Sequence, residues 1–158
     1  MQVKVLTVSD GVVHGTREDR SGAALADRVR DEGWVLAGQA VCADGVDEVA
    51  GALRVLADGF HGLVVTTGGT GFGPRDLTPE GTRAVIDREA PGLAEAMRLV
   101  NPLGRLSRGI AGTIGTTLIV NTPGSSVGCI ECLEAVVDVV PHAVRLLVDN
   151  ADPHPFAG

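Results

Sequence analysis

A glycine-rich segment over residues 66–80 carries the residue types that bind a phosphorylated ligand. Glycines let successive backbone N–H groups point at one anion with no Cβ in the way. The helix expected beyond Thr78 adds a field that favours phosphate. Arg75 supplies a cation for phosphate oxygens, and Asp76 supplies the oxygen ligand that Mg²⁺ uses beside a polyphosphate. Because these features follow one apolar run within fifteen residues, they favour a functional site over an ordinary loop.

Two further carboxylates follow predicted strands. Asp44 comes directly after an apolar run, and Asp10 comes two residues after another. On its own, Asp44 is best explained as a plain helix cap. In a parallel sheet, however, the carboxyl ends of the strands share one edge, so Asp10, Asp44 and Asp76 are expected to converge. Two or three carboxylates beside an arginine indicate a Mg²⁺ site for phosphoryl or nucleotidyl transfer.

A third loop, residues 121–126, also ends a predicted strand and begins a predicted helix. Its sequence is Asn-Thr-Pro-Gly-Ser-Ser. Such a loop forms a second anion cradle or a simple turn with a serine cap, and the spacing favours neither.

The elements that must position these loops alternate along the chain. Four apolar runs predict strands, at residues 3–8, 34–43, 63–67 and 117–121. Amphipathic or capped segments predict helices, at residues 22–32, 44–58, 78–90, 93–100 and 126–149, the last divided in two at Pro141. The βαβαβ order predicts a three-layer α/β/α fold with a doubly wound, mostly parallel sheet. Glycine-rich residues 103–116 predict a small hairpin or extended arm. One domain is expected over residues 1–150, followed by a tail at 151–158.

Composition narrows the possible functions. The 158 residues are 44% hydrophobic and 21% charged, as expected for a globular domain. The net charge of −7 argues against a nucleic-acid partner, and no apolar run is long enough to span a membrane. The first residues lack the pattern of a secretion signal, so a cytoplasmic location is expected. Lys4 is the single lysine and follows no glycine-rich turn, which excludes a P-loop and leaves no good Schiff-base lysine.

The three cysteines are Cys42, Cys129 and Cys132. The last two have the C-x-x-C spacing of a redox pair. Their flanking residues repeat like one face of a helix, which favours ordinary helix residues carrying reduced thiols. No second C-x-x-C is present to complete a zinc site.

Taken together, the motifs resemble the MogA/MoaB family of molybdenum cofactor biosynthesis proteins. The resemblance covers roughly residues 3–149, in the family's order. It rests on the sequences SDG (residues 9–11), ED-x-SG (18–22), AD (43–44), TGGTG (67–71), RD-x-TPE (75–80), LSRG-x-x-G (106–112) and TLIVN-x-PGS (117–125).

The resemblance implies a molybdopterin adenylyltransferase. Its substrates would be molybdopterin and ATP, its cofactor Mg²⁺, and its products adenylylated molybdopterin and pyrophosphate. Asp44 and Asp76 match the family's two acidic positions and would be the catalytic and metal-binding residues. The remaining matched or neighbouring positions would bind substrate: Ser9, Asp10, Gly68, Gly69, Thr70, Gly71, Arg75, Ser107, Arg108, Pro123, Gly124 and Ser125. The family also implies a homotrimer or hexamer, and a possible transfer of product to a molybdenum insertase.

One departure from the family pattern keeps a second function open. Many members continue the last loop with proline and place a lysine soon after, whereas this chain has Ser126-Val127-Gly128. The alternative is a non-catalytic protein that binds or carries molybdopterin. A related domain of molybdenum insertases and of competence-damage-type deamidases is a further relative, but those proteins need additional domains.

Overall fold

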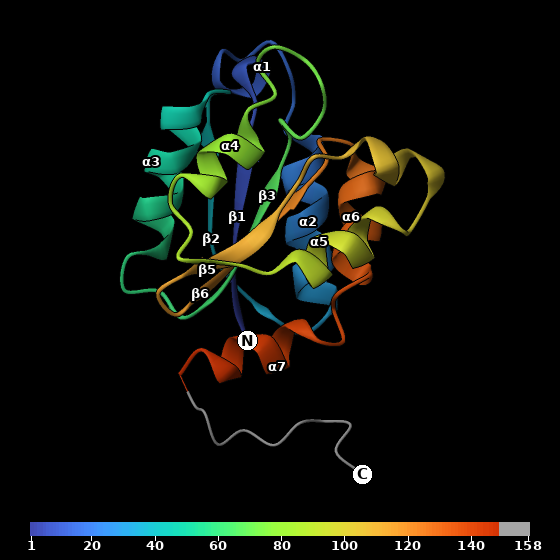
Figure 1. Cartoon of the computed structure of the whole chain (residues 1–158). Helices are drawn as coiled ribbons and strands as arrows, with labels where there is room; N and C mark the ends of the chain where they lie inside the picture. Colours follow the sequence, from blue (N-terminus) through green and yellow to red (C-terminus); the bar gives the residue numbers. More distant parts are fainter. Residues whose placement is uncertain (149–158) are drawn as a thin grey trace.

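A single six-stranded sheet forms the centre of the computed structural model, which describes residues 1–148 (Figure 1). The strands are β1 (Gln2–Val8), β2 (Val35–Cys42), β3 (Gly62–Thr67), β4 (Arg88–Glu89), β5 (Ala111–Ile114) and β6 (Thr117–Thr122). Their order across the sheet is β2-β1-β3-β6-β5-β4. The first four are parallel, and β5 and β4 are added antiparallel at one edge. The predicted mostly parallel sheet is confirmed.

Helices cover both faces of the sheet (Figure 1). They are α1 (Asp10–Val13), α2 (Arg20–Asp31), α3 (Val46–Ala57), α4 (Thr78–Arg83), α5 (Pro91–Arg98), α6 (Ser126–Glu134) and α7 (Val140–Leu146), with a 3-10 helix η1 (Pro102–Leu106). Two apolar cores result. The larger lies between the sheet and α2, α5, α6 and α7, and the smaller lies beneath α3. The predicted three-layer arrangement is therefore confirmed.

The two central strands, β3 and β6, have continuous apolar runs in their sequences because they are buried on both faces. Every residue of β3 and β6 is buried. Leu63 and Val65 point into the larger core, while Val64 between them points into the smaller one. Because both faces of the strand are covered, no alternation of apolar and polar residues remains.

Several predicted boundaries need correction. The helix after Thr78 ends at Arg83, not near residue 90, because the chain leaves it to form the edge strand β4. The Asp87 amide donates to the carbonyl oxygen of Thr113 on the way. Helix α2 begins at Arg20 and is capped by the Asp19 carboxylate, not by Ser21. Helix α1, a single turn capped by Ser9, was not predicted.

The segment predicted as a hairpin or arm has two parts. Residues 102–106 form η1, and β5 pairs with β6 as an antiparallel hairpin within the main sheet. Pro141 lies in the first turn of α7, so two separate helices are found where the sequence predicted them. The predicted tail at residues 151–158 lies outside the described residues. Within residues 1–148, no helix is both long and apolar enough to cross a bilayer.

Candidate functional site

A cleft of about 1400 Å³ lies at the carboxyl ends of the parallel strands. Its walls come from the ends of β1 and β3, the glycine-rich loop, the first turns of α2 and α6, and residues 100–107. A pocket for one small molecule typically measures roughly 300–1,000 Å³. The cleft is therefore large enough for two ligands side by side.

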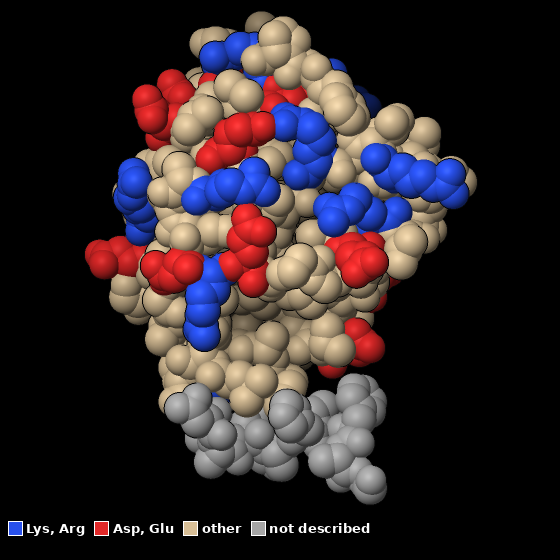
Figure 2. Space-filling model, in the orientation of Figure 1, with Lys and Arg blue, Asp and Glu red and all other residues tan. Residues whose placement is uncertain are grey.

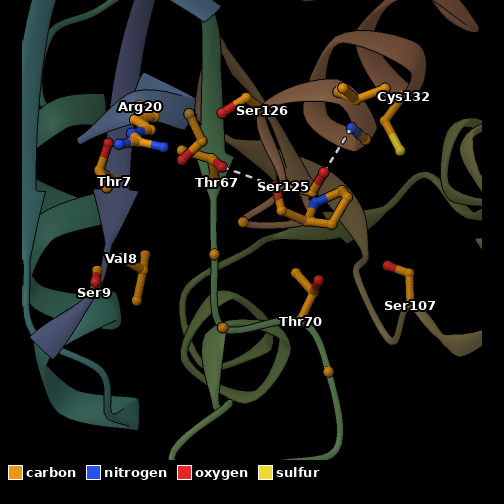
Figure 3. Close-up of a pocket in the computed structure, with 18 of the residues that line it drawn as sticks. Thr7, Val8, Ser9, Arg20, Thr67, Thr70, Ser107, Ser125, Ser126 and Cys132 are labelled. Carbon is orange, nitrogen blue, oxygen red and sulfur yellow. Dashed lines mark hydrogen bonds between the residues drawn. The ribbon is translucent and has the colours of Figure 1, made fainter. Parts of the chain in front are cut away.

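Many of the polar side chains that line this cleft carry a hydroxyl group. Figure 3 shows them arranged around the cavity: Thr7, Ser9, Thr67, Thr70, Ser107, Ser125 and Ser126. Thr7 and Thr67 are register partners on neighbouring strands. The Thr67 hydroxyl donates to the Pro123 carbonyl oxygen at 2.8 Å, which ties the end of β3 to the loop after β6. Thr7, Thr67 and Ser126 were not predicted, although their place at the ends of predicted strands and at a helix start was a usable signal.

The glycine-rich loop is folded tightly against its neighbours. Gly68 and Gly69 have φ angles of +101° and +62°, in the left-handed region that favours glycine. A Cβ at Gly68 would overlap the carbonyl oxygen of Val8, and one at Gly124 would lie 3.3 Å from the Gly68 Cα. The two predicted loops therefore touch each other and form one floor of the cleft.

The loop over residues 121–126 has the predicted serine cap and also lies at the cleft. The Ser125 hydroxyl caps α6 by accepting from the Gly128 amide at 3.2 Å (Figure 3). Pro123, Gly124 and Ser125 also line the cleft. The same loop therefore both caps α6 and forms part of the cleft wall.

Two of the three predicted carboxylates line the cleft, namely Asp44 and Asp76. Asp44 Oδ1 lies 3.2 Å from where a Cβ at Gly69 would be, and Asp76 Oδ2 lies 2.8 Å from where one at Gly71 would be. Asp76 Oδ2 also accepts from the Gly73 amide at 2.8 Å. Both carboxylates are thus held against the glycine-rich loop.

The expected convergence of all three carboxylates is wrong. Within residues 1–148, no three side chains of His, Cys, Asp or Glu form a group that could hold a metal. Asp10 instead accepts from the Asp44 amide and from Arg75. The Arg75 guanidinium lowers the pKa of Asp10, so this carboxylate is ionised at neutral pH.

Neither Arg75 nor Arg108 lines the cleft, although Ser107 does. Arg75 pairs with Asp10, and Arg108 pairs with Glu80, whose pKa is lowered by this contact. On the face seen in Figure 2, basic and acidic side chains alternate without one continuous basic surface. Such pairing leaves little free positive charge on these two arginines.

The Cys-x-x-Cys pair lies within α6, with both thiols buried and free. Cys132 reaches the wall of the cleft (Figure 3). The Cys129 Sγ lies 3.4 Å from the Ser126 carbonyl oxygen, as a helical residue would. Burial raises the pKa of both thiols to about 11. These observations favour ordinary helix residues over a redox pair.

Slow alkylation of the native thiols is the expected consequence. The pKa of Cys42 is also raised to about 11, chiefly by burial, so all three thiols stay protonated until the pH approaches that value. At pH 8, where the thiolate is the reactive form, iodoacetamide should label the folded chain about a hundredfold more slowly than the unfolded chain. Mass spectrometry of timed samples measures this. Rapid labelling of Cys129 or Cys132 in the folded chain would contradict their assignment as inert core residues.

Comparison with known proteins identifies the family. Residues 4–142 match the family model described as a probable molybdopterin binding domain. The chain is 36% identical to the molybdopterin adenylyltransferase of Helicobacter pylori strain J99, covering 95% of this chain and 89% of that protein. The crystal structure of the molybdopterin biosynthesis enzyme MoaB from Thermus thermophilus is 45% identical and superposes with a TM-score of 0.87, covering 92% of this chain and 95% of that one.

A longer relative contains the same unit. The molybdenum cofactor synthesis protein cinnamon of Drosophila melanogaster is 37% identical over 92% of this chain, which spans only 25% of that protein. The match to the family model and the shared fold together show that this chain belongs to the molybdopterin-binding domain family of molybdenum cofactor biosynthesis proteins.

Proposed function

We propose that this chain is a molybdopterin adenylyltransferase that uses Mg²⁺ and ATP. One observation carries the proposal: two carboxylates, Asp44 and Asp76, flank a glycine-rich loop in a cleft large enough for both substrates. The relative of that name from Helicobacter pylori is similar over nearly the whole of both chains. The site thus combines the parts that nucleotidyl transfer needs with a family that binds molybdopterin.

The residues present fit a Mg²⁺ ion. Mg²⁺ is usually held by one or two carboxylates together with substrate phosphates, and it keeps several waters. Asp44 and Asp76 provide these two carboxylates from different loops. When bound, the ion would neutralise charge on the triphosphate.

The rest of the site would position the substrates. The backbone amides of residues 68–71 and the hydroxyl of Thr70 would bind phosphate oxygens, and the hydroxyls on the opposite wall would hold the second ligand. An oxygen of the molybdopterin phosphate would attack the α-phosphorus of ATP. The bond between the α-phosphorus and its bridging oxygen to the β-phosphorus would break, and pyrophosphate would leave with that electron pair. No protein nucleophile is needed, so catalysis rests on positioning and electrostatics.

Pyrophosphate release tests this reaction. A mixture of the chain, ATP, Mg²⁺ and molybdopterin should release pyrophosphate, and leaving out any one component should stop it. The alternative function is a carrier that binds molybdopterin without transferring an adenylyl group. Binding of molybdopterin with no release of pyrophosphate would favour that carrier. The supporting departure is the stretch Ser126-Val127-Gly128, which lacks the proline and the lysine that many family members have in this region.

The metal requirement has its own test. ATP binding measured by calorimetry should weaken at least tenfold when EDTA replaces Mg²⁺, because Asp44 and Asp76 would otherwise face the triphosphate without an intervening cation. Equally tight binding in EDTA would remove both carboxylates from the proposed metal site.

We also propose that the chain works in the cytoplasm as a homotrimer or hexamer and passes its product to a molybdenum insertase. Several large apolar side chains of the described surface are exposed and support self-association, among them Leu99, Leu103 and Leu106. Light scattering should give a mass of at least three times 16.2 kDa. A single monomer peak would contradict the oligomer.

A further inference from the structure

We propose that Arg75 and Arg108 are positioning residues, each of which clamps one of the two cleft carboxylates instead of contacting a phosphate. The effect on catalysis rests on the function proposed above, but the clamps themselves do not. The resemblance implied substrate contacts for both arginines, so this assignment changes their role.

The first clamp joins the ends of β1 and β2. The Asp10 amide donates to Asp44 Oδ2 at 2.8 Å, and the Asp44 amide donates to Asp10 Oδ1 at 3.0 Å. Arg75 closes this reciprocal pair by donating to both Asp10 oxygens, at 3.1 and 3.2 Å, and to the Asp44 carbonyl oxygen. The Asp44 carboxylate is therefore fixed through a residue 65 positions away from Arg75.

The second clamp spans the glycine-rich loop. Arg108 Nε donates to the Gly71 carbonyl oxygen at 2.7 Å, and its guanidinium also contacts the Asp76 carbonyl oxygen and the Glu80 carboxylate. Its own amide donates to the Thr70 carbonyl oxygen at 2.9 Å. The loop is thus held on both sides of Asp76, which keeps that carboxylate at the Gly73 amide.

The partners that these two guanidiniums already have argue against a phosphate contact. In Arg108, all three nitrogens already donate to the loop or to α4. The charge of each arginine is matched by a carboxylate, Glu80 or Asp10. Arg17 and Arg20 do line the cleft, Arg20 in an exposed pair with Glu18, and both remain candidates for contacting an anionic ligand.

Kinetics separate the two roles. Arg75→Gln and Arg108→Gln should each lower kcat by about 10- to 100-fold, because misplaced groups lose the reactive geometry. Their KM for ATP should stay within about threefold of the original value, since no bound phosphate loses a contact. Arg83→Gln is the matched control, because it breaks an exposed pair with Glu89 away from the cleft and should leave both constants unchanged. A raised KM with unchanged kcat would overturn the positioning role.

Amide hydrogen exchange tests the clamps without any activity. In Arg75→Gln, the Asp10 and Asp44 amides should exchange at least tenfold faster, and in Arg108→Gln the Gly73 amide should do so. Core amides of β3 should be unaffected, which shows that the chain is folded. Arg75→Lys and Arg108→Lys keep the positive charge but lose the planar guanidinium with its two-pronged hydrogen bonding. These variants should protect the same amides from exchange only in part. Unchanged exchange in the glutamine variants would disprove the clamps even if adenylylation is confirmed, and loss of protection would support them even if it is not.

Discussion

Replacing Asp76 with asparagine should lower the rate of adenylylation by about 10²- to 10³-fold while the chain stays folded. Asparagine has nearly the same shape, and its side-chain oxygen can still accept from the Gly73 amide that binds Asp76 Oδ2. Only the negative charge that would hold Mg²⁺ is lost. The kcat at saturating ATP, with the Mg²⁺ concentration varied, measures the effect.

Asp58→Asn is the matched control for this substitution. Asp58 is the C-cap of α3 and does not line the cleft. The same loss of charge there should leave kcat within about twofold of the original value, because exposed charges far from a site are screened. Full activity of Asp76→Asn would show that Asp76 is not the metal ligand.

Replacing Gly68 with alanine should destabilise the folded chain strongly. The φ of +101° is strained for any L side chain, and the added Cβ would overlap the Val8 carbonyl oxygen. Strain and overlap together should lower the free energy of unfolding by about 3 kcal/mol or more. Urea unfolding measures this value, and the surviving folded chain should bind ATP weakly because the loop has moved.

Gly51→Ala provides the contrast. Gly51 lies inside α3, and nothing lies within 4 Å of where its Cβ would be. The substitution should raise the free energy of unfolding by about 0.5–1 kcal/mol, because alanine loses less backbone freedom in a helix. Equal stability of the two variants would contradict the close approach of β1 and the loop at Gly68.

The sequence predicted those parts of the fold that carry a local pattern. Strands β1, β3 and β6 were predictable because burial on both faces leaves continuous apolar runs. Strand β4 has two residues, and it exists only because Arg88 and Glu89 pair with β5. A pairing partner more than twenty residues away leaves no local signal, so this strand was predicted as helix.

The site shows the same division. In a parallel sheet, ligands bind at the carboxyl ends of the strands. From this principle the sequence correctly placed Asp44 and Asp76 in one cleft with the glycine-rich loop and the loop after β6. It also predicted that Asp10 would face the same space, whereas the structure turns its carboxylate to Arg75 and the Asp44 amide. A guanidinium can meet a phosphate or a carboxylate equally well, and only the three-dimensional positions of Asp10 and Glu80 decide between them.

Mass spectrometry of the reaction product tests the central claim most directly. Purified chain would be incubated with molybdopterin, ATP and Mg²⁺, and the molecular masses in the pterin fraction would be measured before and after the reaction. The account predicts a new species heavier than molybdopterin by one adenylyl group, formed by the original chain and nearly absent with Asp76→Asn. Molybdopterin that stays bound but unchanged in mass would contradict an adenylyltransferase and identify the chain as a carrier.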